Sequence, residues 1–154
     1  MKGSKVHQKM YNQDYAWFRK SEARAILPEK PIKGAKQKVP RDLVERLARL
    51  HLVDLVRGHT SPFPLKAIKN ANLTAEVIDV KGNLVELRYE GRTLSSEVHD
   101  GVHIEGKWNR PGPGIPKPEK RGMDAKLEGH ALYDQKLEKF ISFNVVAVTK
   151  RWGG

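Results

Sequence analysis

The stretch LTAEVIDVKGNLVELRYEG, residues 73–91, decides the fold. Apolar and polar side chains alternate on both sides of KGN, which is the pattern of a β-hairpin. A three-residue KGN loop would set Leu87 opposite Val77 on one face and Arg88 opposite Glu76 on the other. A two-residue turn would set Leu87 opposite Glu76 instead. The first register pairs apolar with apolar and base with acid, so it is the register that we predict.

Further strands are predicted on the C-terminal side of this hairpin. A third strand is predicted around residues 92–107, with a split at the turn-forming dipeptide Asp100-Gly101. The proline-rich stretch 109–122 predicts a long mobile loop, and a strand follows it. The segment FISFNVVAVTKRW, residues 140–152, is apolar on both faces, which favours a central strand or one covered by the N-terminal helices. The sheet should contain about four to six strands.

A first helix is predicted near the N-terminus. Asn12 can cap it, Tyr15 and Phe18 share its apolar face, and Pro28 ends it near Leu27. The stretch PEKPIKGAKQKVP that follows is predicted to hold no regular structure, as a linker or a draped basic strap.

A second helix is predicted to begin at Pro40, because proline is preorganised for the first helical turn. Its apolar stripe would be Leu43, Leu47 and Leu50. Residues Glu45 and Arg49 have the spacing of a favourable ion pair on one helix face.

These elements together predict an α+β fold, with one or two N-terminal helices packed on an antiparallel β-meander. The sheet would be open or a partial barrel. We divide the chain into a basic N-terminal segment, residues 1–39, and an α+β domain with the meander, residues 40–154.

Positive charge is concentrated in the first half of the chain. The 154 residues carry a net charge of +11. Residues 1–72 hold 16 Lys and Arg against 6 Asp and Glu, and residues 73–154 hold 13 against 12, so the halves carry +10 and +1. This asymmetry suggests an anionic partner, although a solubilising arm would produce the same pattern.

Compartment and oligomeric state are not set by the sequence. There is no cysteine, and no apolar run follows the basic N-terminus or is long enough to span a bilayer. A secretory signal peptide is therefore not predicted. A native Met1 would place the protein in the cytoplasm.

The strongest arrangement of metal-ligand residue types is SSEVHDGVHIEGK, residues 95–107. His99 and His103 are weak candidates for metal ligands, since on one strand they would lie about 13 Å apart. A turn at Asp100-Gly101 would place them on opposite faces. We therefore predict no metal and no cofactor.

Catalytic motifs are absent: the sequence has no P-loop, no G-x-G-x-x-G and no G-x-S-x-G. The chain is accordingly interpreted as non-enzymatic, with a metal-dependent enzyme domain kept as an alternative.

Nucleic-acid binding has more support, because basic and aromatic residues are mixed in the N-terminal segment. Tyr15 and Phe18 fit the core face of the predicted helix, whereas Trp17 lies off that face and is the candidate for base stacking. The predicted binding residues are Lys2, Lys5, Lys9, Trp17, Arg19, Lys20, Lys33, Lys36 and Lys38. No RNP, KH or zinc-finger signature is present, so binding would be structural or weakly specific.

Two stretches, PRDLVERLARLHLVDLVRGHTSPF and RGMDAKLEGHALYDQKLEKFISFNVVAVTKRWG, resemble segments of a group of uncharacterised bacterial proteins. In that group a similar helix precedes a β-rich region. No activity is assigned to the group, so the resemblance implies no functional residue. The relatives continue past the equivalent of RWG, which implies that this chain is a domain of something longer.

The expected function is a binding module whose basic N-terminal half contacts RNA or a ribonucleoprotein. A ligand-binding or interaction domain of a bacterial envelope protein is the alternative, suggested by the meander and the resemblance.

Overall fold

The computed structural model describes residues 13–52, 62–99, 103–104, 107–108 and 119–153. It contains two short helices and a five-stranded antiparallel sheet in the order β1-β2-β3-β6-β7, which confirms the predicted α+β fold. The helices are α1 (Lys20–Ala25) and α2 (Arg41–Leu50), followed by a 3-10 turn, η2 (Leu65–Ala67). The sheet strands are β1 (Lys36–Lys38), β2 (Ile68–Lys81), β3 (Leu84–His99), β6 (Glu119–Asp134) and β7 (Lys139–Trp152). A separate two-stranded ribbon pairs β4 (His103–Ile104) with β5 (Lys107–Trp108).

The predicted hairpin register is confirmed, although the turn differs from the predicted loop. Leu87 pairs with Val77 and Arg88 pairs with Glu76, and their side chains form an ion pair at 2.7 Å. Lys81 pairs with Leu84, so the turn has two central residues rather than three. A bulge between Val77 and Asp79 then shifts the pairing by one residue and restores the predicted register.

The second hairpin strand is longer than predicted. β3 runs without interruption through Gly91 to His99, so residues 92–99 continue the hairpin and form no separate third strand. On its other side β3 pairs with β6 along its whole length. Of the predicted long loop 109–122, Glu119–Gly122 belong to β6, and residues 109–118 lie outside the described residues.

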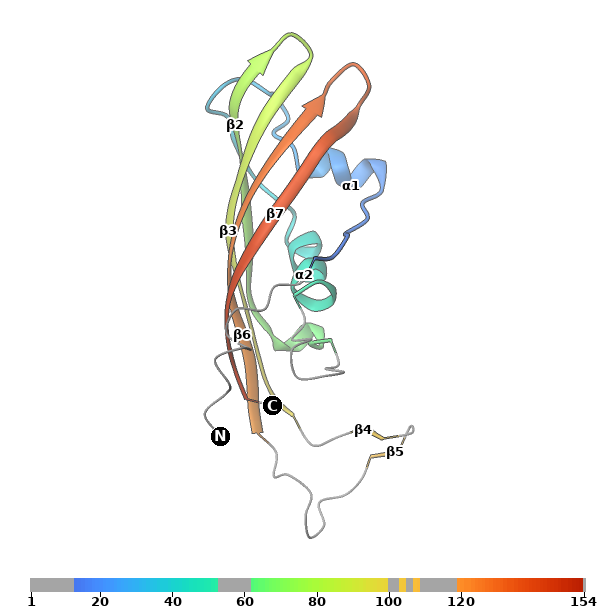
Figure 1. Ribbon diagram of the computed structural model, residues 1–154, viewed down its shortest axis with the longest axis vertical. Coiled ribbons are helices and arrows are strands. Elements are labelled where there is room, and N and C mark those ends of the chain that lie inside the picture. Colours follow the sequence, from blue (N-terminus) through green and yellow to red (C-terminus); the bar gives the residue numbers. More distant parts are fainter. Residues whose placement is uncertain (1–12, 53–61, 100–102, 105–106, 109–118, 154) are drawn as a thin grey trace.

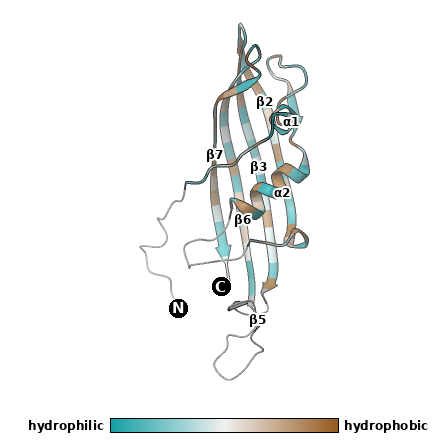
Figure 2. Ribbon diagram, turned by 90° about the vertical axis from the view of Figure 1, so that its right-hand side faces the viewer, coloured by the Kyte–Doolittle hydropathy of each residue, from teal (hydrophilic) through white to brown (hydrophobic). Residues whose placement is uncertain are grey.

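The core lies between the helices and one face of the sheet. Both helices lie on the same side of the strands, which run along the long axis of the molecule (Figure 1). α2 packs against β2 and β3. It buries Leu43, Val44 and Ala48, and brown segments of the sheet lie behind both helices in Figure 2. The strand residues buried on this face include Ala75, Val77, Leu87, Tyr89 and Leu127.

The first helix is shorter than predicted. Only Lys20–Ala25 is helical, and residues 13–19 are not. Tyr15 is 71% exposed, so its assignment to a helix core face is wrong. Phe18 does reach the core side, where its ring contacts Phe143 edge to face at 6.0 Å.

The second helix begins at Arg41, with Pro40 as the N-cap residue. Its buried face is turned relative to the predicted stripe, because Leu50 is 49% exposed while Val44 is fully buried. Glu45 accepts a hydrogen bond from Arg41 rather than pairing with Arg49. Arg49 instead donates to the Phe63 carbonyl oxygen at 3.0 Å.

The segment between the helices is more ordered than predicted. Lys36–Lys38 form β1, which pairs with β2. Further backbone hydrogen bonds join Gly34 to Val77 and Val39 to Leu73. Because these bonds cover the outer edge of β2, the expectation that PEKPIKGAKQKVP holds no regular structure is wrong.

β7 is an edge strand, so the first of the two alternatives for it, a central strand, is wrong. The N-terminal part of the chain does contact one of its faces, through Phe18 and Phe143. One face of β7 packs on the core through Phe143, Val145 and Ala147. On the opposite face Val146 is 65% and Val148 is 70% exposed.

Candidate functional site

Residues 13–19 form a segment without helix or strand, which side chains hold against the body of the protein. His51 Nδ1 lies 2.7 Å from Asp14 Oδ2. Arg46 donates to the Trp17 carbonyl oxygen at 3.2 Å. The Arg46 guanidinium carbon lies 5.1 Å from the centre of the Phe18 ring, within the range of a cation–π contact. The segment is therefore attached at three successive points.

The attached segment points two aromatic side chains outward. Trp17 is 87% exposed and Tyr15 is 71% exposed. Arg19, the next residue but one after Trp17, is also exposed. Within the described residues no carboxylate lies within ion-pair distance of the Arg19 guanidinium. Two aromatic rings and a cation are thus presented to solvent on one short segment.

Two of the predicted lysines, Lys36 and Lys38, lie on a different face of the sheet from the segment that carries Trp17. Lys20 forms an ion pair with Glu138. Lys36 lies 3.4 Å from Glu76. Lys36 and Lys38 pair with β2 residues of the open face, which is the sheet face away from the helices. Of the remaining predicted residues, Lys33 is exposed, and its positive charge attracts the Asp79 carboxylate. Lys2, Lys5 and Lys9 lie outside the described residues.

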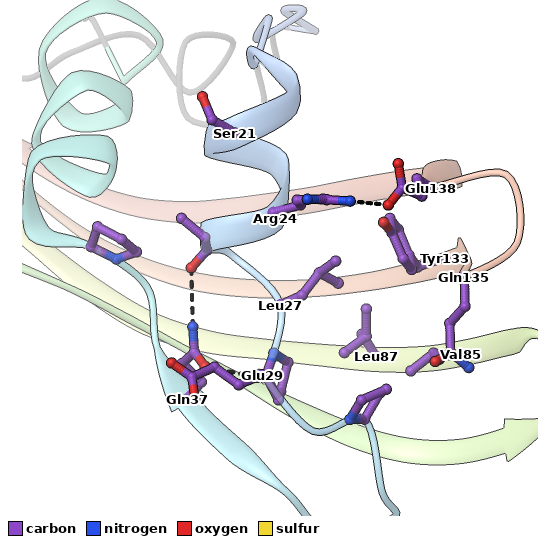
Figure 3. Close-up of a pocket in the computed structure, with 14 residues that line it drawn as sticks. Ser21, Arg24, Leu27, Glu29, Gln37, Val85, Leu87, Tyr133, Gln135 and Glu138 are labelled. Atoms are coloured by element: carbon purple, nitrogen blue, oxygen red, sulfur yellow. Dashed lines mark hydrogen bonds and ion pairs between the residues drawn. The ribbon is translucent and has the colours of Figure 1, made fainter.

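A cavity that the sequence did not reveal lies between α1, the segment after it and the sheet. Its volume is about 680 Å³. Leu87 and Val85 of β3 and Leu27 line it with apolar atoms, and Tyr133 of β6 lies at one side (Figure 3). No motif signals this cavity, because its walls come from four separate parts of the chain.

Several polar groups around the cavity already have hydrogen-bond or ion-pair partners. Arg24 and Glu138 form an ion pair at the rim (Figure 3). The Gln37 amide donates to the Ala25 carbonyl oxygen at 3.2 Å and accepts from the Glu29 backbone N–H at 3.0 Å. These bonds fix the wall of the cavity.

The open face of the sheet carries ion pairs between neighbouring side chains. Besides Arg88 and Glu76, Arg92 binds Asp124 with two hydrogen bonds, and Lys126 lies 2.6 Å from Glu128. Hydrogen bonding from Arg92 lowers the pKa of the Asp124 carboxyl, and hydrogen bonding from Arg88 lowers the pKa of Glu76.

Acid is therefore expected to destabilise the protein. A carboxyl whose pKa is lower in the folded than in the unfolded chain stabilises the fold above its unfolded pKa. That contribution disappears as the pH falls below about 4, through the folded pKa. The thermal midpoint should therefore fall between pH 7 and pH 3, and it should fall less in Asp124→Asn than in the unchanged protein. An unchanged or rising midpoint in acid would contradict this assignment.

The described residues give no support for a metal site. Among them, no group of three or more His, Asp or Glu side chains is placed to hold a metal ion. The side chains of His99 and His103 lie outside the described residues. Glu97, which lies on β3 two residues before His99, is bound to Arg121.

No family model matches this chain, and it has no match among the curated proteins or the solved structures. None of the described helices has the length and apolar character needed to cross a membrane.

Proposed function

We propose that this chain is a non-enzymatic binding module whose N-terminal half contacts an anionic polymer, namely RNA or a ribonucleoprotein. The observation that carries the proposal is the outward position of Trp17 and Tyr15 on a segment attached to the body. Exposed aromatic rings are platforms on which bases stack, and neighbouring cations contact phosphates. Arg19 is suited to the second role, and the charge of +10 in residues 1–72 supports it.

The attachment of the segment also favours binding. Ordering a flexible segment on binding costs conformational entropy, and that cost is reduced where contacts already hold the backbone. Asp14, Phe18 and the Trp17 carbonyl provide such contacts. The aromatic rings would therefore be positioned before a base arrives.

Point substitutions test the proposal better than deletion of the whole basic N-terminal segment, residues 1–39, because Ile26 and Val39 in that segment are buried in the core. Fluorescence anisotropy with a labelled single-stranded RNA should give a dissociation constant that rises steeply with salt. Trp17→Ala should weaken binding about tenfold, since stacking of one base contributes about 1–3 kcal/mol. Arg19→Gln should reduce the slope of the logarithmic salt dependence by about one.

Leu65→Ala is the matched control, because Leu65 is also an exposed apolar residue, at 55%, and lies in η2 rather than in the segment. It should bind RNA as the unchanged protein does. Binding that is absent, insensitive to salt or equally strong in Trp17→Ala would refute the proposal.

A second candidate function is small-ligand binding, which the cavity beneath α1 favours. Its volume of about 680 Å³ and its mixed lining, apolar at Leu27 and polar at Arg24 and Gln135, would suit a small molecule with both apolar and polar groups. Arg24 at the rim could bind a carboxylate on that molecule. The ligand carboxylate would then replace Glu138 as the ion-pair partner of Arg24. Absence of RNA binding would make this cavity the next site to test.

A further inference from the structure

β7 has one edge to which no strand in the described part of the chain is paired. β6 occupies its other edge along residues 139–152. The opposite edge of the sheet differs, since its edge strand is β1, which has only three residues, two of them lysines, and is extended by backbone bonds at Gly34 and Val39. Unpaired N–H and C=O groups along an edge strand are ready to pair with a further strand.

The central part of β7 lacks the charged residues by which proteins usually prevent edge pairing, although the strand has lysines at its ends, Lys139 and Lys150, and a bulge near Ile141. Residues 140–149, FISFNVVAVT, contain no charged residue, no proline and no glycine. Natural edge strands are commonly protected by lysine, proline or short length. Val146 and Val148, on the open face, remain 65% and 70% exposed. An uncharged, exposed edge of this length indicates that a partner strand covers it.

We propose that the partner is a second copy of this chain, whose β7 pairs antiparallel with β7 about a two-fold axis through Ala147. Side chains alternate between the faces of a strand, so a symmetric pairing that matches the faces must be centred on a residue. The candidate centres in the exposed region are Val146, Ala147 and Val148. Each centre sets a different residue of the second copy opposite Val146.

The charges on β6 favour the centre at Ala147. Glu128 pairs with Val146 and Lys126 pairs with Val148 across the β6–β7 ladder. With the axis at Ala147, Val146 faces Val148 of the second copy, so Glu128 of one copy and Lys126 of the other lie in the same row. An axis at Val146 would align Glu128 with Glu128, and an axis at Val148 would align Lys126 with Lys126. Of the three axes, only the one at Ala147 sets unlike charges in one row; they lie about 14 Å apart across the two β7 strands. Within each copy Lys126 and Glu128 already pair with each other at 2.6 Å.

The same register suits the other face of the sheet. Ala147 would lie against Ala147 of the second copy, and Val145 would lie against Thr149. Phe143, Val145 and Ala147 already belong to the core side of the sheet. Pairing therefore would join the two cores side by side and produce one ten-stranded sheet, from two sheets of five strands.

The absence of cysteine in the sequence permits a direct test of this register in the full chain. Residues opposite one another in antiparallel strands have Cα atoms about 4.5–5.5 Å apart, which a disulfide can bridge. Under mild oxidation Ala147→Cys should give a covalent dimer, and light scattering should give twice the chain mass for the unchanged protein. Thr149→Cys should not cross-link, because the two Thr149 residues would lie about 13 Å apart along the strands.

A second variant tests the surface without a cross-link. Val146→Lys would place a charged side chain on the edge strand, which is how natural proteins block edge pairing, and it should raise the dimer dissociation constant at least about tenfold. Ile32→Lys, at a residue that is 67% exposed and not on β7, is the control and should leave the mass doubled. Circular dichroism should show that both variants remain folded.

Three outcomes would overturn the proposal. A monomeric mass for the unchanged protein at micromolar concentration, together with no cross-link in Ala147→Cys, would exclude the dimer. Efficient cross-linking of Val146→Cys or Val148→Cys in place of Ala147→Cys would exclude the register. A dimer that Val146→Lys leaves intact would place the interface elsewhere.

Discussion

Replacing Glu97 with glutamine should lower the free energy of unfolding by about 3 kcal/mol, because it leaves a buried guanidinium without its counter-charge. The Arg121 side chain is 7% exposed and that of Glu97 is 16% exposed. Arg121 Nε donates to Glu97 Oε1 at 2.7 Å, and its guanidinium carbon lies 4.7 Å from the centre of the Phe63 ring. The ring contact cannot replace the lost charge.

Urea denaturation measures this effect, and Glu128→Gln is its matched control. Glu128 also pairs with a cation, but both partners are more than 60% exposed. Such a surface pair contributes about 0–1 kcal/mol, so the control should lose little stability. The double variant Glu97→Gln with Arg121→Met should recover part of the loss, since it removes the unpaired charge. Equal losses in Glu97→Gln and Glu128→Gln would contradict this account.

Leu87→Ala is expected to cost about 3 kcal/mol, the usual range for truncating a fully buried leucine. Leu87 is 0% exposed and pairs with Val77 at the centre of the predicted hairpin. It also forms part of the floor of the cavity beneath α1. Truncation would therefore remove packing and enlarge a cavity that already exists.

Leu84→Ala is the matched control on the same strand, because Leu84 is 38% exposed. Its loss should stay near about 1 kcal/mol, since less apolar area returns to water. Both variants should be compared by their urea midpoints at equal slope. A loss for Leu87→Ala no larger than that for Leu84→Ala would show that the cavity floor relaxes on truncation.

The hairpin could be predicted because its chemistry is local. Matching Leu87 with Val77 and Arg88 with Glu76 requires only the alternation of side chains and opposite charges. The bulge near Ile78 could not be predicted in this way. A three-residue loop without a bulge and a two-residue turn with one unpaired residue both set Leu87 opposite Val77.

The elements that were predicted wrongly depend on contacts between distant parts of the chain. The spacing of Tyr15 and Phe18 suits a helix, but residues 13–19 are not helical. Phe18 instead contacts Phe143 and Arg46, which are distant in the sequence. Propensity is a weak guide where tertiary contacts compete with it. The apolar pattern of β7 likewise fits a central strand, and only the order of the strands shows that one edge is unpaired.

The candidate site was predictable only in part. Trp17 was proposed for stacking from its position off the apolar face, and it is 87% exposed, although whether it binds bases stays a prediction. The separation of Lys36 and Lys38 from Trp17 could not be foreseen, because it depends on pairing between β1 and β2. The cavity was missed for the same reason, since its walls meet only in the folded chain.

The place of the helices before the sheet has a consequence for how the chain folds during synthesis. Synthesis proceeds from the N-terminus, so α2 leaves the ribosome before the β2 and β3 residues that bury Val44. Phe18 must wait longer, because its partner Phe143 lies in β7. The hairpins of the meander can form locally, but the Phe18 ring lacks this partner until the last strand of the sheet is made. Chaperones that bind nascent chains would therefore meet an exposed Phe18 ring.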